Sequence, residues 1–279
     1  GEDAVLGDAL VDDARTRFIN FTGSVGTGMR IYERASKVQP GQGFLKKVFM
    51  EMGGKDAMIV DETADLDAAA DAAIAAAFGF QGQKCSAMSR LIVVDEVHDA
   101  LVEKVRVRAE RLQVGDAEQN ADVAAVIDEV QHAKILGFID RAKPHATLLM
   151  GGNAGSDAGW FIEPTIFTDV DPDSELAQEE VFGPVVAVVR ARDFDHALQL
   201  ANDTKYALTG GLFSRLRDRI ERVRSEFRVG NLYINRKITG SLVGVQPFGG
   251  FDMSGTNAKA GGPDYIRLFL EAKTVTERF

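Results

Sequence analysis

Two patterns of hydrophobic residues alternate along the chain, and together they predict a mixed α/β fold. Short apolar runs, typical of buried strands, occupy residues 17–23, 47–52, 57–60, 90–95, 147–150, 160–167, 185–189 and 231–235. Segments in which apolar residues recur with the helical period occupy residues 29–37, 67–80, 96–112, 126–143, 193–201 and 216–227. Because strands and helices alternate from Arg90 onward, the pattern favours helices packed on a sheet over a bundle or a sandwich.

The composition argues against nucleic acid, metal ions and membranes as partners. The 279 residues are 45% hydrophobic with a formal net charge of −10, so we expect a soluble globular protein that does not bind nucleic acid, which needs clustered basic residues. One cysteine excludes an internal disulfide framework and a zinc site built from cysteines, and the four histidines lack metal-ligand spacing. We therefore expect no metal. No apolar run approaches the ~20 residues that span a bilayer, so no membrane partner is expected either.

The sole cysteine, Cys85, lies in the polar loop 82–87, between a helix-like and a strand-like segment. A thiol in such a loop can be presented at a cleft, and the neighbouring Lys84 is expected to favour the thiolate, which is the nucleophilic form. A lone cysteine is also common as a small buried hydrophobe. Both interpretations stay open at this point.

A glutamate, Glu51, ends the strand-like run 47–52 and precedes Gly53 and Gly54. Burial at the end of a strand disfavours the charged carboxylate and raises its pKa toward a value useful for a general base. The alternative is an ordinary strand-end glutamate whose side chain reaches solvent.

Three further segments combine glycine with polar residues. Gly23 and Ser24 stand between a strand and a helix, where free backbone N–H groups can hold a phosphate, although an ordinary turn with a serine N-cap predicts the same residues. Glu180 and Phe182 precede a buried strand in the run 178–184. The longest loop-like region is 236–262, and loops of such length in a compact domain tend to be functional.

Five of these segments, in this order, resemble motifs of the aldehyde dehydrogenase superfamily. They are Phe-Thr-Gly-Ser at 21–24, Glu-Met-Gly-Gly-Lys at 51–55, Gly-Gln-Lys-Cys at 82–85, Glu-Glu-Val-Phe-Gly-Pro at 179–184 and Pro-Phe-Gly-Gly at 247–250. Within the superfamily, residues 233–248, 259–263 and 273–279 resemble the Δ1-pyrroline-5-carboxylate dehydrogenase subfamily, whose members oxidise glutamate γ-semialdehyde in proline catabolism. Asp252 departs from the basic or amide residue that the family often has there.

The resemblance implies a three-layer open sheet and a division of the chain into three parts. Residues 1–54 would be the C-terminal part of a Rossmann-like NAD-binding domain, and residues 55–252 the catalytic domain with the nucleophile loop. Residues 253–279 would form a C-terminal helix and an oligomerisation strand, which implies a homo-oligomer.

The resemblance also implies a role for each candidate residue in an NAD-dependent dehydrogenase that acts on a small aldehyde. Cys85 would attack the aldehyde to give a thiohemiacetal, and Glu51 would activate the water that hydrolyses the thioester left after hydride transfer to NAD. The cofactor would be bound by four residues: Gly23, Ser24, Glu180 and Phe182. The substrate would be bound by four others: Ser86, Gly240, Ser241 and Phe248.

The resemblance covers only about the C-terminal half of a typical family member. We therefore expect the natural N-terminus, the asparagine of the oxyanion hole and the grip on the adenosine ribose to lie upstream, and this chain alone to bind NAD poorly. Two alternatives follow: another semialdehyde dehydrogenase, or a catalytically incomplete fragment with a structural or assembly role. A reduced thiol favours the cytoplasm, while a mitochondrial address would lie upstream.

Overall fold

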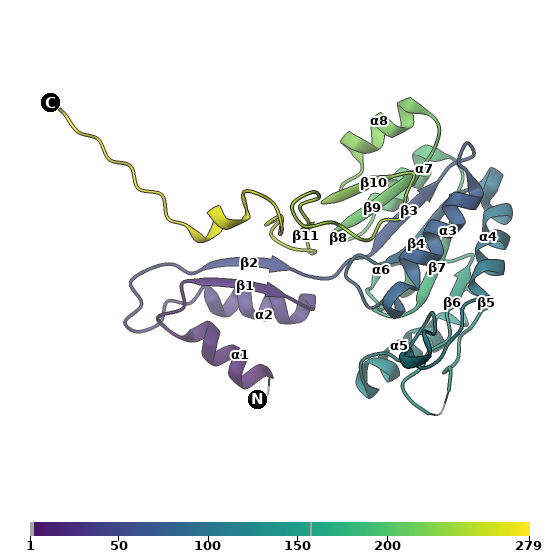
Figure 1. Cartoon of the computed structure of the whole chain (residues 1–279), viewed down its shortest axis with the longest axis horizontal. Coiled ribbons are helices and arrows are strands. Elements are labelled where there is room, and N and C mark those ends of the chain that lie inside the picture. The colour runs from purple at the N-terminus through teal and green to yellow at the C-terminus, as the bar shows by residue number, and fades with distance from the viewer. Residues whose placement is uncertain (1–2, 157) are drawn as a thin grey trace.

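A mostly parallel sheet forms the centre of the fold in a computed structural model that describes residues 3–156 and 158–279 (Figure 1). Within those residues the sheet has seven strands, in the order β10-β9-β3-β4-β7-β6-β5, and only β5 runs antiparallel to its neighbour. Their bounds, in chain order, are β3 Asp56–Val60, β4 Met88–Val94, β5 Thr147–Met150, β6 Thr165–Thr168, β7 Val185–Ala191, β9 Thr209–Phe213 and β10 Asn231–Ile234.

Helices cover both faces of this sheet and make it the middle of three layers. The helices are α3 Leu66–Ala77, α4 Asp95–Ala109, α5 Glu129–Ala142, α6 Glu175–Gln178, α7 Phe194–Asn202 and α8 Arg217–Glu226. Buried residues of α3 and α4 pack on one face, and those of α5, α6, α7 and α8 on the other. The predicted three-layer open sheet is confirmed by this arrangement and by its match to solved structures described below.

Strand β3 shows why the central strands are continuous apolar runs in the sequence. Ala57 and Ile59 point into the core under α7, whereas Met58 and Val60 point into the core under α3 and α4. All five residues of the strand are buried. A strand buried on both faces has no solvent side, so its sequence need not alternate with polar residues.

A smaller parallel pair lies beside the main sheet. Strands β1 (Phe18–Thr22) and β2 (Lys47–Glu51) pair in register from Phe18–Lys47 to Thr22–Glu51. Helix α2 (Val25–Ala35) packs on this pair and helix α1 (Asp3–Asp12) packs on α2, and Figure 1 shows all four elements together in purple and blue. The four residues after Glu51 lead directly into β3, so the end of β2 lies at the junction of the two sheets. The predicted boundaries at residues 54 and 252 stay predictions.

Strand β9 was not expected from the sequence, because Gly210 and Gly211 interrupt its apolar pattern. Both glycines are required by close packing rather than by a turn. A Cβ on Gly210 would lie 2.4 Å from the ring of Phe227, and one on Gly211 would lie 2.6 Å from Ile238. The short strands β8 (Tyr206–Ala207) and β11 (Phe251–Asp252), which pair antiparallel, were also missed.

Two predicted elements start too early. The strand expected over 160–167 begins only at Thr165, directly after Pro164, which has no N–H to offer a ladder. The helix expected from Val126 begins at Glu129, because the Asp128 carboxylate caps it by accepting from Gln131 N at 2.8 Å. Three short 3-10 helices complete the described elements: η1 Gly79–Gly82, η2 Ala117–Gln119 and η3 Tyr265–Phe269.

The last part of the chain leaves the body of the molecule. The predicted C-terminal helix is the short 3-10 helix η3, and the ring of its Phe269 packs against Phe49 with ring centroids 5.1 Å apart. Residues 270–279 belong to no helix or strand, and Figure 1 shows them in yellow extending away from the other elements. The oligomerisation strand stays a prediction, because its pairing partner would belong to another subunit.

Candidate active site

A cleft of about 730 Å³ brings together nine of the ten residues singled out from the sequence, and only Glu51 is not part of its lining. Its walls come from the end of β1, the turn before α2, the loop after η1, the start of α5, the segment before β7 and the 240–248 loop. The nine residues are Gly23, Ser24, Cys85, Ser86, Glu180, Phe182, Gly240, Ser241 and Phe248.

The loop that carries Cys85 follows an abrupt change of chain direction. Phe80, Gln81 and Gly82 all have positive φ, at 60°, 57° and 64°. A Cβ on Gly82 would lie 2.2 Å from the Gly183 carbonyl oxygen, so only glycine allows this close approach. The turn places the loop that carries Cys85 directly against the segment that carries Phe182.

The surroundings of Cys85 favour the protonated thiol. Burial raises its pKa to about 12, with further contributions from the carboxyl groups of Asp56, Glu180 and Glu51, while the Ser86 N–H opposes the rise. Lys84 does not provide the expected help: its Nζ lies 5.8 Å from the centroid of the Phe80 ring, and it is not among the main groups that shift the pKa of the thiol. Cys85 therefore needs a base to become a nucleophile near neutral pH.

Glu51 has the properties of such a base. Its side chain is only 9% exposed, which excludes the alternative of a strand-end carboxylate in solvent. Burial raises its pKa to about 7, although the Gly250 backbone amide and the Lys259 ammonium oppose the rise. Neither carboxyl oxygen has a partner that meets hydrogen-bond geometry, so both are free to take up a proton.

Gly53 and Gly54 connect β2 to β3 and let the chain pass between the thiol loop and Glu180. A Cβ on Gly54 would lie 2.4 Å from the Cys85 carbonyl oxygen, and one on Gly53 would lie 2.3 Å from Glu180 Oε2. The Gly54 N–H donates to Glu180 Oε1 at 3.0 Å. Burial raises the pKa of Glu180 despite this bond. The two glycines thus set how closely the carboxylate approaches the thiol loop.

At the other end of the cleft, Ser24 is the N-cap of α2 and accepts from Thr27 N at 3.3 Å. The N-cap interpretation is therefore confirmed. It does not exclude the phosphate interpretation, because Gly23 and Ser24 also line the cleft and the first turn of α2 carries no acidic residue.

The long 236–262 loop supplies the remaining wall. Gly240 has φ of +84°, and the Ser241 hydroxyl forms a hydrogen bond with the Tyr233 hydroxyl. Phe248 is fixed by its N–H, which donates to the Ala260 carbonyl at 2.9 Å. Loop residues in the cleft are thus held by the strand β10 and by the loop itself.

Two residues of α5 that were not predicted also line the cleft. Gln131 Nε2 donates to the carbonyl oxygens of Val181 at 3.2 Å and of Phe182 at 2.9 Å, which holds Phe182 at a φ of +59°. The Lys134 ammonium lowers the pKa of Glu180 against the effect of burial. The only sequence signal was their spacing of one helical turn on an otherwise amphipathic segment.

Asp252, which departs from the family pattern, has a structural partner. Its carboxylate accepts two hydrogen bonds from the Arg228 guanidinium, at 2.9 Å and 2.8 Å. This pair ties β11 to the segment between α8 and β10, and it lowers the pKa of Asp252.

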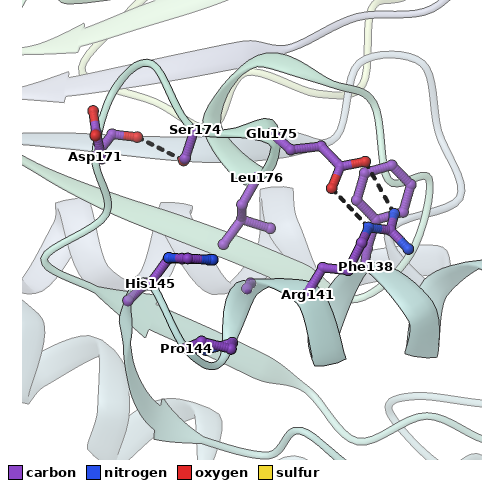
Figure 2. A pocket seen from close by; sticks show the side chains of 10 residues that line it. Phe138, Arg141, Pro144, His145, Asp171, Ser174, Glu175 and Leu176 are labelled. Carbon is purple, nitrogen blue, oxygen red and sulfur yellow. Dashed lines mark hydrogen bonds and ion pairs between the residues drawn. The ribbon is translucent and has the colours of Figure 1, made fainter.

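A second hollow of about 700 Å³ shares no lining residue with the cleft (Figure 2). It lies between the end of α5 and the loop before α6, and its Arg141 guanidinium is paired with Glu175 at 2.8 Å.

Within residues 3–156 and 158–279, no cluster of His, Cys, Asp or Glu suits a metal ion. In the same residues, no helix combines the length and the apolar character needed to cross a bilayer.

Comparisons with known proteins identify the family of the chain. The chain is 56% identical over 280 residues to the 1-pyrroline-5-carboxylate dehydrogenase of Geobacillus thermodenitrificans and 53% identical to that of Bacillus subtilis. Each match covers 100% of this chain and 54% of the relative, so the chain spans about half the length of the curated relatives it matches. A crystal structure of a Thermus 1-pyrroline-5-carboxylate dehydrogenase with bound NAD superposes with a TM-score of 0.98 at 55% identity, over 100% of this chain and 54% of that one.

A more distant structure, betaine aldehyde dehydrogenase from Staphylococcus aureus, superposes with a TM-score of 0.85 at 31% identity over 92% of this chain and 52% of that one. The profile described as the aldehyde dehydrogenase family matches residues 1–275. Because this match covers nearly the whole chain, the chain belongs to the aldehyde dehydrogenase family.

Proposed function

We propose that this chain acts in the NAD-dependent oxidation of glutamate γ-semialdehyde to glutamate, with Cys85 as nucleophile and Glu51 as general base. Relatives at 53–56% identity are named 1-pyrroline-5-carboxylate dehydrogenase, after the cyclic form of this aldehyde. The observation that carries the chemistry is a thiol in the cleft within electrostatic range of a buried carboxyl group whose pKa is about 7.

The first step is addition of the Cys85 thiol to the aldehyde carbon. The thiol is protonated near neutral pH, so Glu51 accepts its proton as the S–C bond forms. The carbonyl oxygen becomes an alkoxide that the backbone N–H of Cys85 stabilises, and the alkoxide takes the proton from Glu51 to give a thiohemiacetal and an ionised Glu51.

The oxidation needs a hydride acceptor, and bound NAD supplies it. The residues present suit a dinucleotide, because the cleft joins the N-terminus of α2 to the Glu180 carboxylate. Backbone N–H groups beside Gly23 and Ser24 would hold the anionic pyrophosphate. Glu180 would accept from a ribose hydroxyl, and Phe182 would pack beside the nicotinamide.

The last step is hydrolysis of the thioester that remains on Cys85 when a hydride and a proton have left the thiohemiacetal. Glu51 takes a proton from water as the water oxygen attacks the thioester carbonyl, and the Cys85 thiolate leaves and is reprotonated. Free carboxyl oxygens and a pKa of about 7 suit Glu51 to both proton transfers.

Selection among aldehydes would depend on the 240–248 loop. The Gly240 N–H and the Ser241 hydroxyl would donate to the α-carboxylate of the substrate, while Ser86 and Phe248 would contact its aliphatic part. Such donors discriminate against aldehydes without that carboxylate, because they would then be buried without partners.

Residues 270–279 would pair with the sheet of a second copy, which would account for their extended course outside any helix or strand of this chain. Light scattering on a variant that ends at residue 269 measures this: a smaller assembly than the full chain is expected, and an unchanged mass contradicts the pairing.

An activated ester tests the catalytic pair without the cofactor. p-Nitrophenyl acetate acylates a cysteine directly, so the wild-type chain should release a burst of nitrophenol followed by slower turnover. Cys85→Ala should lose the burst, and Glu51→Gln should slow both the burst and the later turnover, the turnover by about 10²-fold or more. A full burst in Cys85→Ala contradicts the assignment of the nucleophile.

The substrate is tested by comparing NAD reduction with three aldehydes: glutamate γ-semialdehyde, succinate semialdehyde and propanal. The first should give the highest kcat/KM. Equal use of succinate semialdehyde would indicate a different semialdehyde dehydrogenase, and no NAD reduction alongside a normal ester burst would indicate that this chain alone lacks part of the cofactor site.

A further inference from the structure

Lys259 carries a charge close to Glu51. It does not line the cleft and has no part in the mechanism above. It lies in the loop after β11, half-buried, in the left-handed backbone region with φ of +51°. Its charge acts on Glu51, and that of Glu51 acts on it in return. The two side chains nevertheless form no direct ion pair.

The ammonium group of Lys259 is occupied by three acceptors. Its Nζ donates to the Gly249 carbonyl at 2.7 Å, to the Asn231 side-chain oxygen at 3.3 Å and to the Gly230 carbonyl. Three acceptors match the three N–H bonds of the protonated ammonium, whereas a neutral amine has only two, although burial lowers the pKa of Lys259.

These contacts hold one wall of the Glu51 site. A Cβ on Gly249 would lie 2.6 Å from Glu51 Oε1, so the Gly249 backbone already presses against the carboxyl group. Asn231 fixes the same backbone from the other side, because its side-chain oxygen accepts from Gly249 N at 3.2 Å and its Nδ2 donates to the Pro247 carbonyl at 3.0 Å.

We propose that Lys259 is a positioning residue for Glu51: it clamps the Gly249 wall against the carboxyl group and supplies a positive charge from behind that wall. The inference rests on the proposed function, since it concerns the base of that reaction. An ammonium in direct contact would occupy a carboxylate oxygen and keep Glu51 ionised. An ammonium behind the backbone favours the ionised form while leaving both oxygens free for the proton of the thiol or of water.

The pH dependence of thioester hydrolysis measures this role. The groups that titrate or carry charge and face Glu51 are Lys259, from the loop after β11, and Cys85, from the loop before β4. During hydrolysis Cys85 is acylated and cannot titrate, so Lys259 is the charge that remains. Steady-state turnover of p-nitrophenyl acetate after the burst reports this step without NAD.

Lys259→Gln keeps hydrogen-bond donors for the carbonyl groups and removes the charge. The acid limb of its profile should move to higher pH by roughly one unit, which lowers the rate about tenfold on that limb and leaves the alkaline plateau nearly unchanged. Lys259→Arg, which keeps the charge, should return the midpoint toward that of the wild type.

Asn231→Ala is the matched control for the wall alone, because it loosens Gly249 without changing any charge. It should lower the rate at every pH with an unchanged midpoint. An unshifted midpoint in Lys259→Gln, with a normal burst, overturns the role of the charge. Loss of the burst in the wild-type chain would instead contradict the proposed function.

A measurement on the unaltered chain covers the case in which Lys259→Gln does not fold. The NMR resonance of the Lys259 side-chain nitrogen should shift as Glu51 titrates near neutral pH, and that step should be absent in Glu51→Gln. A Lys259 resonance that does not respond to the titration also overturns the proposal.

Discussion

Replacing Glu51 by glutamine should stabilise the folded chain, and increasingly so as the pH rises. The pKa of Glu51 is about 7 in the folded chain against 4.5 for the free side chain. The folded state therefore binds the proton more tightly than the unfolded state, and between these two values the wild type loses stability with rising pH. A glutamine side chain has no proton to lose, so the variant is spared that loss.

The size of the effect follows from the two pKa values. Their difference is 7 − 4.5 = 2.5 units, which at about 1.36 kcal/mol per unit sets an upper limit of about 3.4 kcal/mol. About 1 kcal/mol of this is already lost at about pH 5, where the unfolded carboxyl group is mostly ionised. The advantage of Glu51→Gln over the wild type should therefore grow by about 2 kcal/mol between about pH 5 and about pH 8.

Urea unfolding at these two pH values measures the difference. Any pH-independent cost of burying the glutamine amide cancels when the two values of ΔΔG are subtracted. Gln119→Ala, an uncharged change at an exposed position, is the control. The difference between its ΔΔG values at the two pH values shows how large a difference arises without the loss of a titratable group. A difference between wild type and Glu51→Gln that does not change with pH would refute a carboxyl group with a raised pKa, and with it the argument that Glu51 is a neutral-pH base.

Three further predictions follow from close contacts and from the loop. Gly54→Ala should slow acylation of Cys85 by at least about tenfold in the ester assay, because the new Cβ meets the Cys85 carbonyl oxygen at 2.4 Å, whereas Gly26→Ala, with open space around it, should not. Gly210→Ala should lower the free energy of unfolding by about 1–3 kcal/mol in urea, since its Cβ meets the Phe227 ring at 2.4 Å; an unchanged midpoint contradicts this packing. Ser241→Ala should raise KM for glutamate γ-semialdehyde several-fold but not that for propanal; equal effects on both would remove the carboxylate role.

Local patterning was sufficient for most of the elements. The apolar runs at 57–60 and 90–95 are the central strands β3 and β4, and the segments at 67–80 and 96–112 are the helices α3 and α4. These predictions succeed because a strand buried on both faces gives a continuous apolar run, and an amphipathic helix gives apolar residues with the helical period. Strand β9 shows no such pattern, because two of its five residues are glycines. These glycines are required by the close approach of side chains from other elements.

The sequence by itself also determined the residue types of the site, namely a single thiol in a loop and a glutamate shortly before two glycines, and it determined the family to which these motifs belong. Tertiary structure decided how these groups behave. The thiol has a raised pKa although a lysine is its neighbour in sequence, because the fold buries it and because Asp56, Glu180 and Glu51 converge on it from other parts of the chain. Lys259 reaches Glu51 across 208 residues of sequence, 259 − 51. Charge and solvent exclusion act through space, so they depend on the assembled fold and leave no periodic signal along the chain.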